Sequence, residues 1–263
     1  MTKSSAPTVK SADRLMALFE YLVATPAATL ASIARDLRIP ASSAYQLVAT
    51  AASRGFVGLD PKTREYFLGP RFWEIAQGSV AEPSIAAKAQ GLMDTLAETT
   101  QETVQLARLD GLDNVYLAIA ESPLPMKLVS RVGSRLPAHA TGVGKTLLAS
   151  VEPDELGRRL EGVALAAFTE NTITDPSELL MELDLIRRRG YGEDREEYLV
   201  GCRCIAMPVR DRHDRVVAAM SVSVPTPRFT PRLERVIHAE LRQSVLELER
   251  RLGAVPSDPK DAS

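Results

Sequence analysis

Hydrophobic residues in the first fifty positions recur at intervals of three and four, the spacing of one face of an α-helix. The pattern occurs three times and predicts three short amphipathic helices. Pro26 ends the first helix, Thr29 is a suitable N-cap for the second, and Pro40 precedes the third. The apolar positions are Leu15, Leu18, Phe19 and Leu22, then Leu30, Ile33, Ala34 and Leu37, then Ala44, Leu47, Val48 and Ala51.

A β-hairpin is predicted directly after the third helix, from the segment GFVGLDPKTREYFLG with its turn at residues 60–63. Three helices followed by a hairpin are typical of a winged helix-turn-helix, whose third helix enters the major groove of DNA. The polar residues of that helix, its end and the hairpin turn are therefore candidate DNA contacts. They are Ser42, Ser43, Tyr45, Gln46, Thr50, Arg54, Lys62 and Arg64.

The chemistry of these side chains suits DNA. Gln46 can form two hydrogen bonds with adenine, and Lys62 and Arg64 can reach the phosphate backbone or the minor groove. Residues 1–77 carry nine Lys/Arg against six Asp/Glu, although the whole chain has a net charge of −2. The third helix has no basic residue before Arg54, so the pattern alone also allows a small helical domain with an ordinary solvated face.

After residue 103 the pattern changes to strands interleaved with helices. The segments TVQLARL and NVYLAIA around DGLD predict a hairpin, and MKLVSRV, CRCIAMPVR and VVAAMSVSVP predict further strands. Helices are predicted at GKTLLAS, PDELGRRL and PSELLMELDLIRRRG, and from Pro231 to Leu252. An antiparallel-rich sheet covered by helices is an α+β fold. Between the two regions we expect helices, with Trp73 packed where the N-terminal domain meets the linker.

Several function classes are excluded by the same sequence. The GVGKT segment has His139 where a phosphate-binding loop requires its first glycine. Cys202 and Cys204 would supply only two metal ligands, and the three histidines are scattered along the chain, so we expect no metal site. We also recognise no cofactor-binding or catalytic motif. No segment is apolar enough for a membrane span or a signal peptide, so we expect a cytoplasmic protein without a membrane partner.

Two cysteines and two serines form the most informative group in the C-terminal region. Alternation places Cys202 and Cys204 on one face of their strand, and Ser221 and Ser223 on one face of the next. With a four-residue loop at 211–214, Cys204 would oppose Ser221 and Cys202 would oppose Ser223. Four small side chains would then leave space for a ligand. The alternative is that the cysteines are core residues and the serines bond to neighbouring backbone.

The chain resembles the IclR-type bacterial transcriptional regulators over about 240 residues. The resemblance lies in RRGYGEDREEYLVGCRCIAMPVRDRHDRVVAAMSVSVP, LPAHATGVGKTLLA and ETVQLARLDGLDNVYLA. It implies a winged helix-turn-helix at 9–71, linker helices at 72–96, a GAF-like mixed-sheet effector domain at 97–253 and a flexible tail at 254–263. It also implies homodimers or homotetramers, which would bind pseudo-palindromic double-stranded operator DNA.

The resemblance further implies a small-molecule effector, either an organic acid or an aromatic metabolite, and no catalysis. We therefore expect a repressor controlled by such an effector, with redox signalling through Cys202 and Cys204 as the alternative. Two departures from the family pattern are Ala41 and Gln46 in place of basic residues, and Asp214 in place of a turn glycine. The implied effector contacts are Leu128, Gly142, Asp194, Cys202, Cys204, Ser221 and Ser223, with Leu128 and Cys202 as apolar wall.

Overall fold

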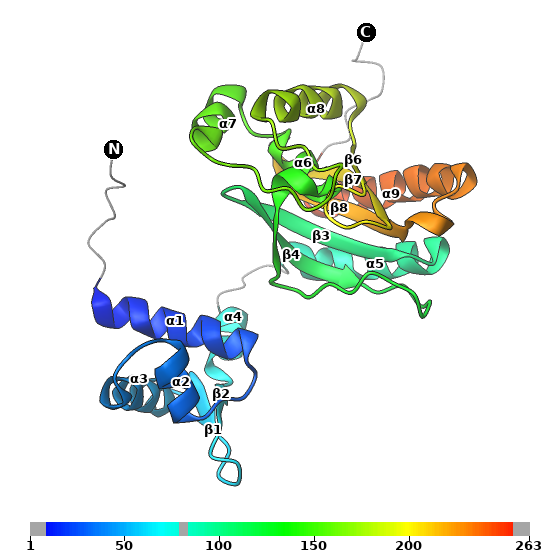
Figure 1. Ribbon diagram of the computed structural model, residues 1–263. Helices are drawn as coiled ribbons and strands as arrows, with labels where there is room; N and C mark the ends of the chain where they lie inside the picture. The colour runs from blue at the N-terminus through cyan, green and yellow to red at the C-terminus, as the bar shows by residue number, and fades with distance from the viewer. Residues whose placement is uncertain (1–8, 79–83, 255–263) are drawn as a thin grey trace. The chain divides into compact units, whose positions relative to one another are not determined.

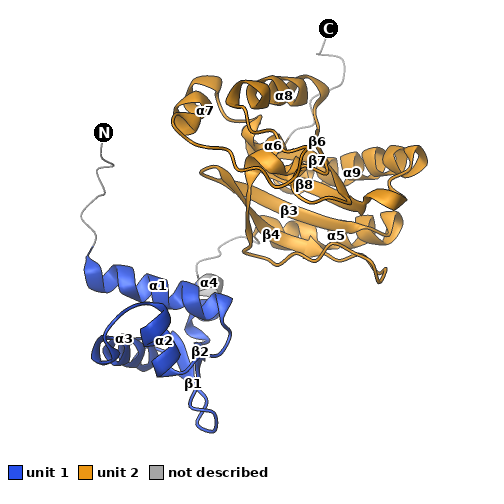
Figure 2. Cartoon of the chain, viewed as in Figure 1, with its two compact units in different colours: residues 1–82 blue, residues 83–263 orange. Residues whose placement is uncertain are grey.

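The computed structural model describes residues 9–78 and 84–254, and Figure 1 shows their helices and strands. The chain divides into two units, residues 1–82 and 83–263 (Figure 2). No helix within the described ranges is long and apolar enough to cross a membrane. The expected linker range, 72–96, spans the division between the units, and most of the expected tail lies outside the described residues.

Unit 1 contains the three predicted helices, the predicted hairpin and one further helix. The prediction of a winged helix-turn-helix is confirmed. Thr29 caps the second helix, because its Oγ1 accepts a hydrogen bond from the Ser32 N–H at 3.2 Å. Asp60 Oδ1 accepts the Lys62 N–H at 2.7 Å and so shapes the hairpin turn. The elements are α1 (Lys10–Ala24), α2 (Leu30–Asp36), α3 (Ala41–Ser53), β1 (Val57–Leu59), β2 (Tyr66–Leu68) and α4 (Arg71–Gly78).

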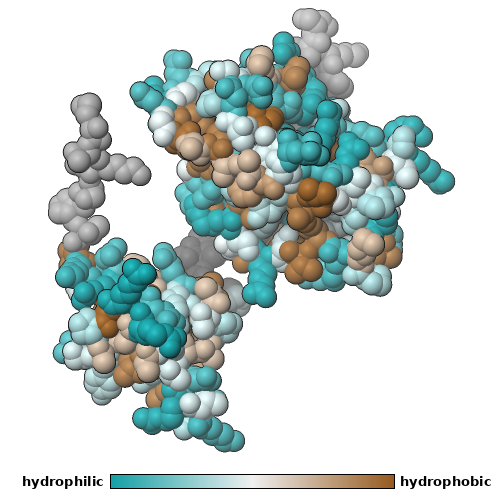
Figure 3. Space-filling model, in the orientation of Figure 1, coloured by the Kyte–Doolittle hydropathy of each residue, from teal (hydrophilic) through white to brown (hydrophobic). Residues whose placement is uncertain are grey.

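An aromatic cluster joins α4 to the rest of unit 1. The Phe72 ring packs edge-on against Phe19 of α1 at 4.8 Å and against Phe56 at 5.0 Å, measured between ring centroids. Trp73 is the next residue of the helix, about 100° further round, and its side chain is 69 % exposed. The prediction that Trp73 packs between domain and linker is therefore wrong. Hydrophobic groups also reach the surface of both units on the face shown in Figure 3.

Unit 2 is built on a six-stranded sheet of order β5-β4-β3-β8-β7-β6. All five pairings are antiparallel, as expected for the α+β class, although the resemblance implied a mixed sheet. The strands are β3 (Thr103–Asp110), β4 (Asp113–Ala120), β5 (Arg135–Pro137), β6 (Gly192–Arg195), β7 (Cys202–Arg210) and β8 (Val216–Pro225). The helices are α5 (Ile85–Thr100), η1 (Ala138–Ala140), α6 (Gly142–Leu148), α7 (Pro153–Leu160), α8 (Pro176–Arg189), η2 (Thr226–Arg228) and α9 (Pro231–Arg251).

Helices cover both faces of this sheet. On one face, Met93 of α5 and Leu241 of α9 are buried against Val104 of β3 and Val222 of β8. On the other face α6 packs on the sheet, with α7 and α8 beyond it (Figure 1). The α6 helix therefore lies over the central strands β3, β8 and β7.

Three details of unit 2 differ from the sequence prediction. The segment 126–132, predicted as a strand, has no regular structure, and the short strands β5 and β6 were not predicted. The third difference is the pairing of β7 with β8. Cys204 opposes Ser223, Ala206 opposes Ser221 and Cys202 opposes Pro225.

The register differs from the expected one by two residues for a simple reason. The hairpin loop has five residues, 211–215, instead of four, and a bulge lies next to the Arg210–Val216 pair. The extra loop residue shifts the pairing by one position, and the bulge shifts it by one more. Because side chains alternate between the two faces of a strand, a total shift of two leaves each side chain on the face that was expected. The cysteines and serines therefore still share one face of the sheet. Asp214 adopts a left-handed conformation, with φ of 60°, at the position where glycine was expected.

Candidate functional site

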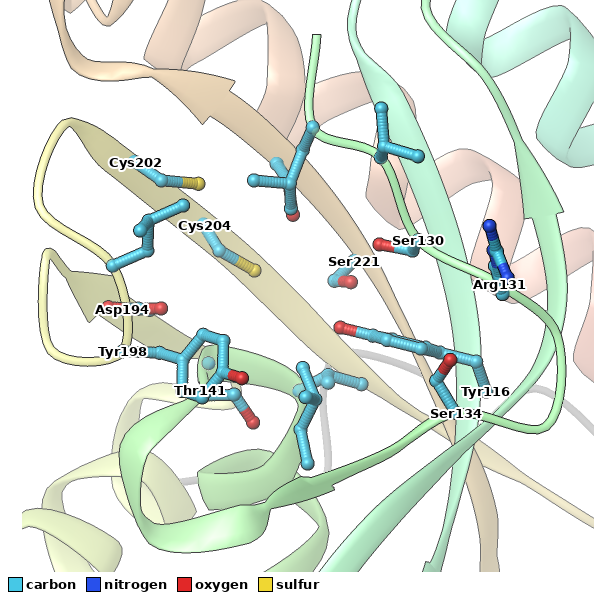
Figure 4. Close-up of a pocket in the computed structure, with 17 residues that line it drawn as sticks. Tyr116, Ser130, Arg131, Ser134, Thr141, Asp194, Tyr198, Cys202, Cys204 and Ser221 are labelled. Atoms are coloured by element: carbon cyan, nitrogen blue, oxygen red, sulfur yellow. The ribbon is translucent and has the colours of Figure 1, made fainter. Parts of the chain in front are cut away.

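A cavity of about 320 Å³ opens on the α6 face of the sheet in unit 2. Its walls are β7 and β8, the start of α6, the segment 128–136 and the turn after β6, and Figure 4 shows the side chains that line it. The structure brings all seven residues of the expected effector set to this cavity. They are Leu128, Gly142, Asp194, Cys202, Cys204, Ser221 and Ser223.

The two serines are oriented by a residue that the sequence analysis did not identify. Gln105, on the neighbouring strand β3, is fully buried. Its Oε1 accepts a hydrogen bond from Ser221 Oγ at 3.2 Å and another from Ser223 Oγ at 2.9 Å. On its other side, Gln105 Nε2 donates to Ser130 Oγ at 3.4 Å. The bottom of the cavity is therefore a connected hydrogen-bond network.

Gly142 allows α6 to approach the sheet closely. A Cβ atom at this position would lie 3.0 Å from the Asp194 backbone nitrogen and 3.1 Å from Cys204 Sγ. Thr141 caps the helix, with its Oγ1 accepting the Gly144 N–H at 3.1 Å. A side chain at Gly142 would push α6 away from β6 and β7, so this glycine sets the width of the cavity.

Asp194 is the acidic residue of the cavity. It lies on the edge strand β6, opposite Cys204, and its Oδ1 accepts the Glu197 N–H at 2.7 Å. Burial raises the pKa of Asp194 to about 7, against the opposing effect of that hydrogen bond. Asp194 is therefore a buried residue of a short strand and not a solvated surface charge.

Lys145 of the GVGKT segment is occupied within the protein. Its Nζ lies 2.5 Å from both carboxylate oxygens of Glu197, and both side chains are buried. This ion pair ties α6 to the turn that carries Tyr198 and Leu199 at the cavity. A phosphate-binding lysine would instead be available to a ligand. His139 is bound as well, with its Nε2 3.0 Å from the Ala166 carbonyl oxygen. The segment is structural here.

The cysteines show none of the features of redox sensors. Both are free and buried. Burial raises the pKa of Cys202 to about 12 and that of Cys204 further still. Because the thiolate is the reactive form, these thiols are poor nucleophiles near neutral pH. The redox alternative has no support in this geometry.

Several cavity residues were not anticipated from the sequence. Most lie on segments without a clear periodic pattern, so their convergence depends on tertiary packing. Tyr116 alternates inward on β4, and this could have been recognised once β4 was placed beside β3. The others include Ser130, Arg131, Ser134, Leu136, Thr141 and Tyr198.

The expected DNA contacts lie in unit 1. Ser42, Tyr45 and Gln46 are exposed along the N-terminal half of α3, and Ser43 is partly buried. Thr50 donates its hydroxyl proton to the Gln46 carbonyl oxygen at 2.8 Å.

The basic candidates fall into two groups. Lys62 and Arg64 are exposed at the tip of the hairpin, whereas Arg54 follows the C-terminus of α3. Arg54 is about 18 Å along the axis from Ser42, since a helix rises about 1.5 Å per residue. Arg38, another exposed basic residue, lies in the connection just before α3 and was not among the expected contacts.

One group of possible metal ligands occurs among the described residues, and it lies outside the cavity. The ligand atoms of Glu193, Glu234 and His238 are within 4.8 Å of one another. Glu193 is already paired with Arg195 at 2.5 Å. We assign no metal to this group.

Comparison with known proteins covers both units. Residues 11–61 match the family model of the IclR helix-turn-helix domain, and residues 77–250 match that of the bacterial transcriptional regulator IclR C-terminal domain. The chain is 33% identical to the HTH-type transcriptional regulator KdgR of Escherichia coli (strain K12), over 85% of each protein. It is 28% identical to the transcriptional repressor IclR of the same strain, over 87% of this chain and 85% of that protein.

A solved structure is similar over nearly the whole chain. It is an IclR homologue from Microbacterium hydrocarbonoxydans complexed with 4-hydroxybenzoate. The TM-score is 0.80 and the identity 26%, with 92% of this chain and 100% of that chain covered.

Proposed function

Because the chain belongs to the IclR family of bacterial transcriptional regulators, we propose that it is a repressor whose operator affinity is set by a small organic acid or aromatic metabolite bound in unit 2. The family assignment makes the protein a DNA-binding regulator and not an enzyme. The repressor role is supported by the similarity to a named repressor. The effector class is supported by the similarity to a homologue complexed with 4-hydroxybenzoate.

The observation that carries the proposal is the cavity beside α6. It joins small polar side chains from two strands to apolar walls, in a volume suited to a small metabolite. The groups around it bind rather than react: the thiols are held protonated, and the serines are bonded to an amide instead of a general base. A ligand would therefore be recognised and released unchanged.

Regulation requires that the effector distinguish two arrangements of the oligomer. A ligand shifts operator binding only by its differential affinity for those arrangements, on a scale of about 1–3 kcal/mol. Two copies of unit 1 on half-sites about one helical turn apart would give the specificity that a single copy lacks. We therefore propose a dimer or tetramer on a pseudo-palindromic operator.

Replacing Ser221 with leucine tests the effector site. The larger side chain would fill the cavity at its polar base, so binding of every effector should be lost. Unit 1 is unchanged, and operator binding without effector should persist. The measurement is operator affinity, by fluorescence anisotropy, with and without a panel of small acids that includes 4-hydroxybenzoate and gluconate.

The matched control is Ser177→Leu, an exposed serine at the start of α8. It should respond to effector as the original protein does. If Ser221→Leu also kept a normal response, the effector would have to bind outside this cavity.

A further inference from the structure

Three hydroxyl groups of the cavity lining donate their protons inside the protein. Ser221 and Ser223 both donate to Gln105 Oε1, at 3.2 and 2.9 Å. Thr141, beside them on the α6 side, donates to Asn114 Oδ1 at 2.7 Å. A hydroxyl group has one proton and two lone pairs. The two serines therefore present lone pairs, and not protons, to a ligand, and Thr141 Oγ1, which also accepts the Gly144 N–H, keeps one lone pair.

Asp194 adds a fourth acceptor to the same side. Its Oδ1 already accepts the Glu197 N–H, and its carboxylate borders the cavity. The charged side chains of the lining are Asp194 and Arg131, and Figure 4 shows them on opposite sides of the cavity. Arg131 forms no ion pair with any residue in the described ranges. The cavity thus has an acceptor-rich side and a cationic side.

We propose that this polarity selects small hydroxylated carboxylic acids, bound with their hydroxyl groups against Ser221, Ser223 and Asp194. The ligand carboxylate lies on the Arg131 side, where the charge is favourable and the repulsion from Asp194 is smallest. The inference rests on the proposed function, which supplies the existence of an effector. It adds the chemical class of that effector and its direction in the cavity.

Gln105 is the positioning residue for this selection. Its amide is held on both sides, since Oε1 faces the two serines while Nε2 donates to Ser130 Oγ at 3.4 Å. Without the Oε1 acceptor, the serine protons would be free to turn into the cavity. The base of the cavity could then donate to a ligand, and its preference for ligand hydroxyl groups would weaken.

The test compares acids that differ only in hydroxyl groups. The pairs are gluconate with hexanoate, glycerate with propionate, and 4-hydroxybenzoate with benzoate. Dissociation constants are measured by calorimetry on the full-length protein at pH 8, where Asp194 is mostly ionised. For at least one pair we expect the hydroxylated member to bind about tenfold more tightly or better, because its partner leaves buried acceptors unpaired. Equal or tighter binding of the unhydroxylated members would overturn the proposal.

Two variants examine the two sides separately. Gln105→Met should reduce the preference within the best pair to about twofold or less, whereas Ser130→Ala, which keeps Oε1 in place, should retain it. Arg131→Gln should weaken both members of that pair alike and leave their ratio unchanged. The matched control is Arg135→Gln, because Arg135 lies outside the cavity lining and pairs with Asp110 at 2.6 Å. An unchanged preference in Gln105→Met, or unchanged affinity in Arg131→Gln, would contradict the assigned roles.

Failure of the inference can be separated from failure of the proposed function. If acids bind and alter operator affinity but the hydroxyl groups bring no preference, the effector site stands and its polarity is wrong. If neither these six acids nor the wider panel binds, the proposed effector function fails, and the inference fails with it. If Gln105→Met does not fold, the ratios in the original protein and the Arg131→Gln variant still decide the matter.

Discussion

Asp194 makes the stability of unit 2 depend on pH. Burial raises its pKa to about 7 from an ordinary value of 3.8, so the folded protein holds a proton at this site that the unfolded chain has already lost. The folded state binds more protons between these two values, and its stability therefore falls as pH rises through them.

The variant Asp194→Asn should remove this dependence. Relative to the variant, we expect the original protein to lose about 2–3 kcal/mol of unfolding free energy between pH 5 and pH 7.5, since one pKa unit corresponds to about 1.4 kcal/mol. Urea unfolding of both proteins across this range measures the difference. If the unfolding free energies of the two proteins changed in parallel with pH, Asp194 would have an ordinary pKa.

Gln46 and Arg64 should contribute to operator binding in different ways. Arg64 is exposed at the wing and can neutralise a phosphate, so Arg64→Ala should weaken all sequences similarly and reduce the salt slope by about one. Gln46→Ala should relax the preference at particular base pairs and cost about 1–3 kcal/mol on the best site. Binding titrations on an operator and its point variants, at several salt concentrations, separate the two. A uniform loss in both variants would exclude base recognition by Gln46.

The residues of the cavity differ in how far the sequence predicted them. Cys204, Ser221 and Ser223 follow from alternation on two neighbouring strands, together with the family resemblance. Gln105 also alternates on its strand, but nothing in the sequence shows that β3 lies between β4 and β8, so its contact with the serines could not be foreseen. Arg131 lies in a segment predicted as a strand, and its place at the cavity depends on that segment remaining unpaired.

At the scale of single elements, two glycines with open space around them allow a clean comparison. Gly190 ends α8 in a left-handed conformation with φ of 80°, and Gly157 lies inside α7; a Cβ would meet no atom within 4 Å at either position. Gly190→Ala should therefore lower the unfolding free energy by about 1 kcal/mol.

Gly157→Ala serves as the opposite case, because alanine favours the helix. It should raise the unfolding free energy by about 0.5–1 kcal/mol. Urea denaturation followed by circular dichroism measures both. If both substitutions changed the unfolding free energy in the same direction, side-chain contacts and not backbone conformation would determine their effects.

The elements themselves were largely predictable, and their pairing less so. Helices were predicted for the segments of α6, α7, α8 and α9, and the structure has a helix in each, with α6 beginning two residues earlier than expected. The register of β7 with β8 was wrong by two residues, because loop length and a bulge are set by backbone details that periodicity does not contain. The strands β5 and β6 have only three and four residues, too few for a pattern to be recognised.

At the scale of the whole molecule, exposed hydrophobic side chains on unit 1 support self-association. Trp73 is the only tryptophan of the chain and is 69 % exposed, which is unusual for so large an apolar group. If the proposed dimer covers it, its fluorescence emission should shift to longer wavelength when dilution separates the subunits. The other large exposed apolar residues of α1 and α4 are Met16, Val23, Phe72 and Ile75.

Trp73→Ala should then raise the dissociation constant of the dimer by about 30-fold, equivalent to about 2 kcal/mol for a central interface residue. Analytical ultracentrifugation measures this change directly. Emission that stays constant while the protein dissociates would place Trp73 outside the interface.

The aromatic contact of Phe72 with Phe19 and Phe56 has a mechanical consequence. It fixes the N-terminal end of α4 to the rest of unit 1. At about 1.5 Å per residue the helix is about 12 Å long, and it moves with unit 1 as one rigid element. A force applied near Gly78 would therefore rotate unit 1 as a whole instead of changing the angle between α4 and the other helices. In the proposed dimer, an effector would then act by changing the distance between the two copies of α3, while each helix keeps its own shape.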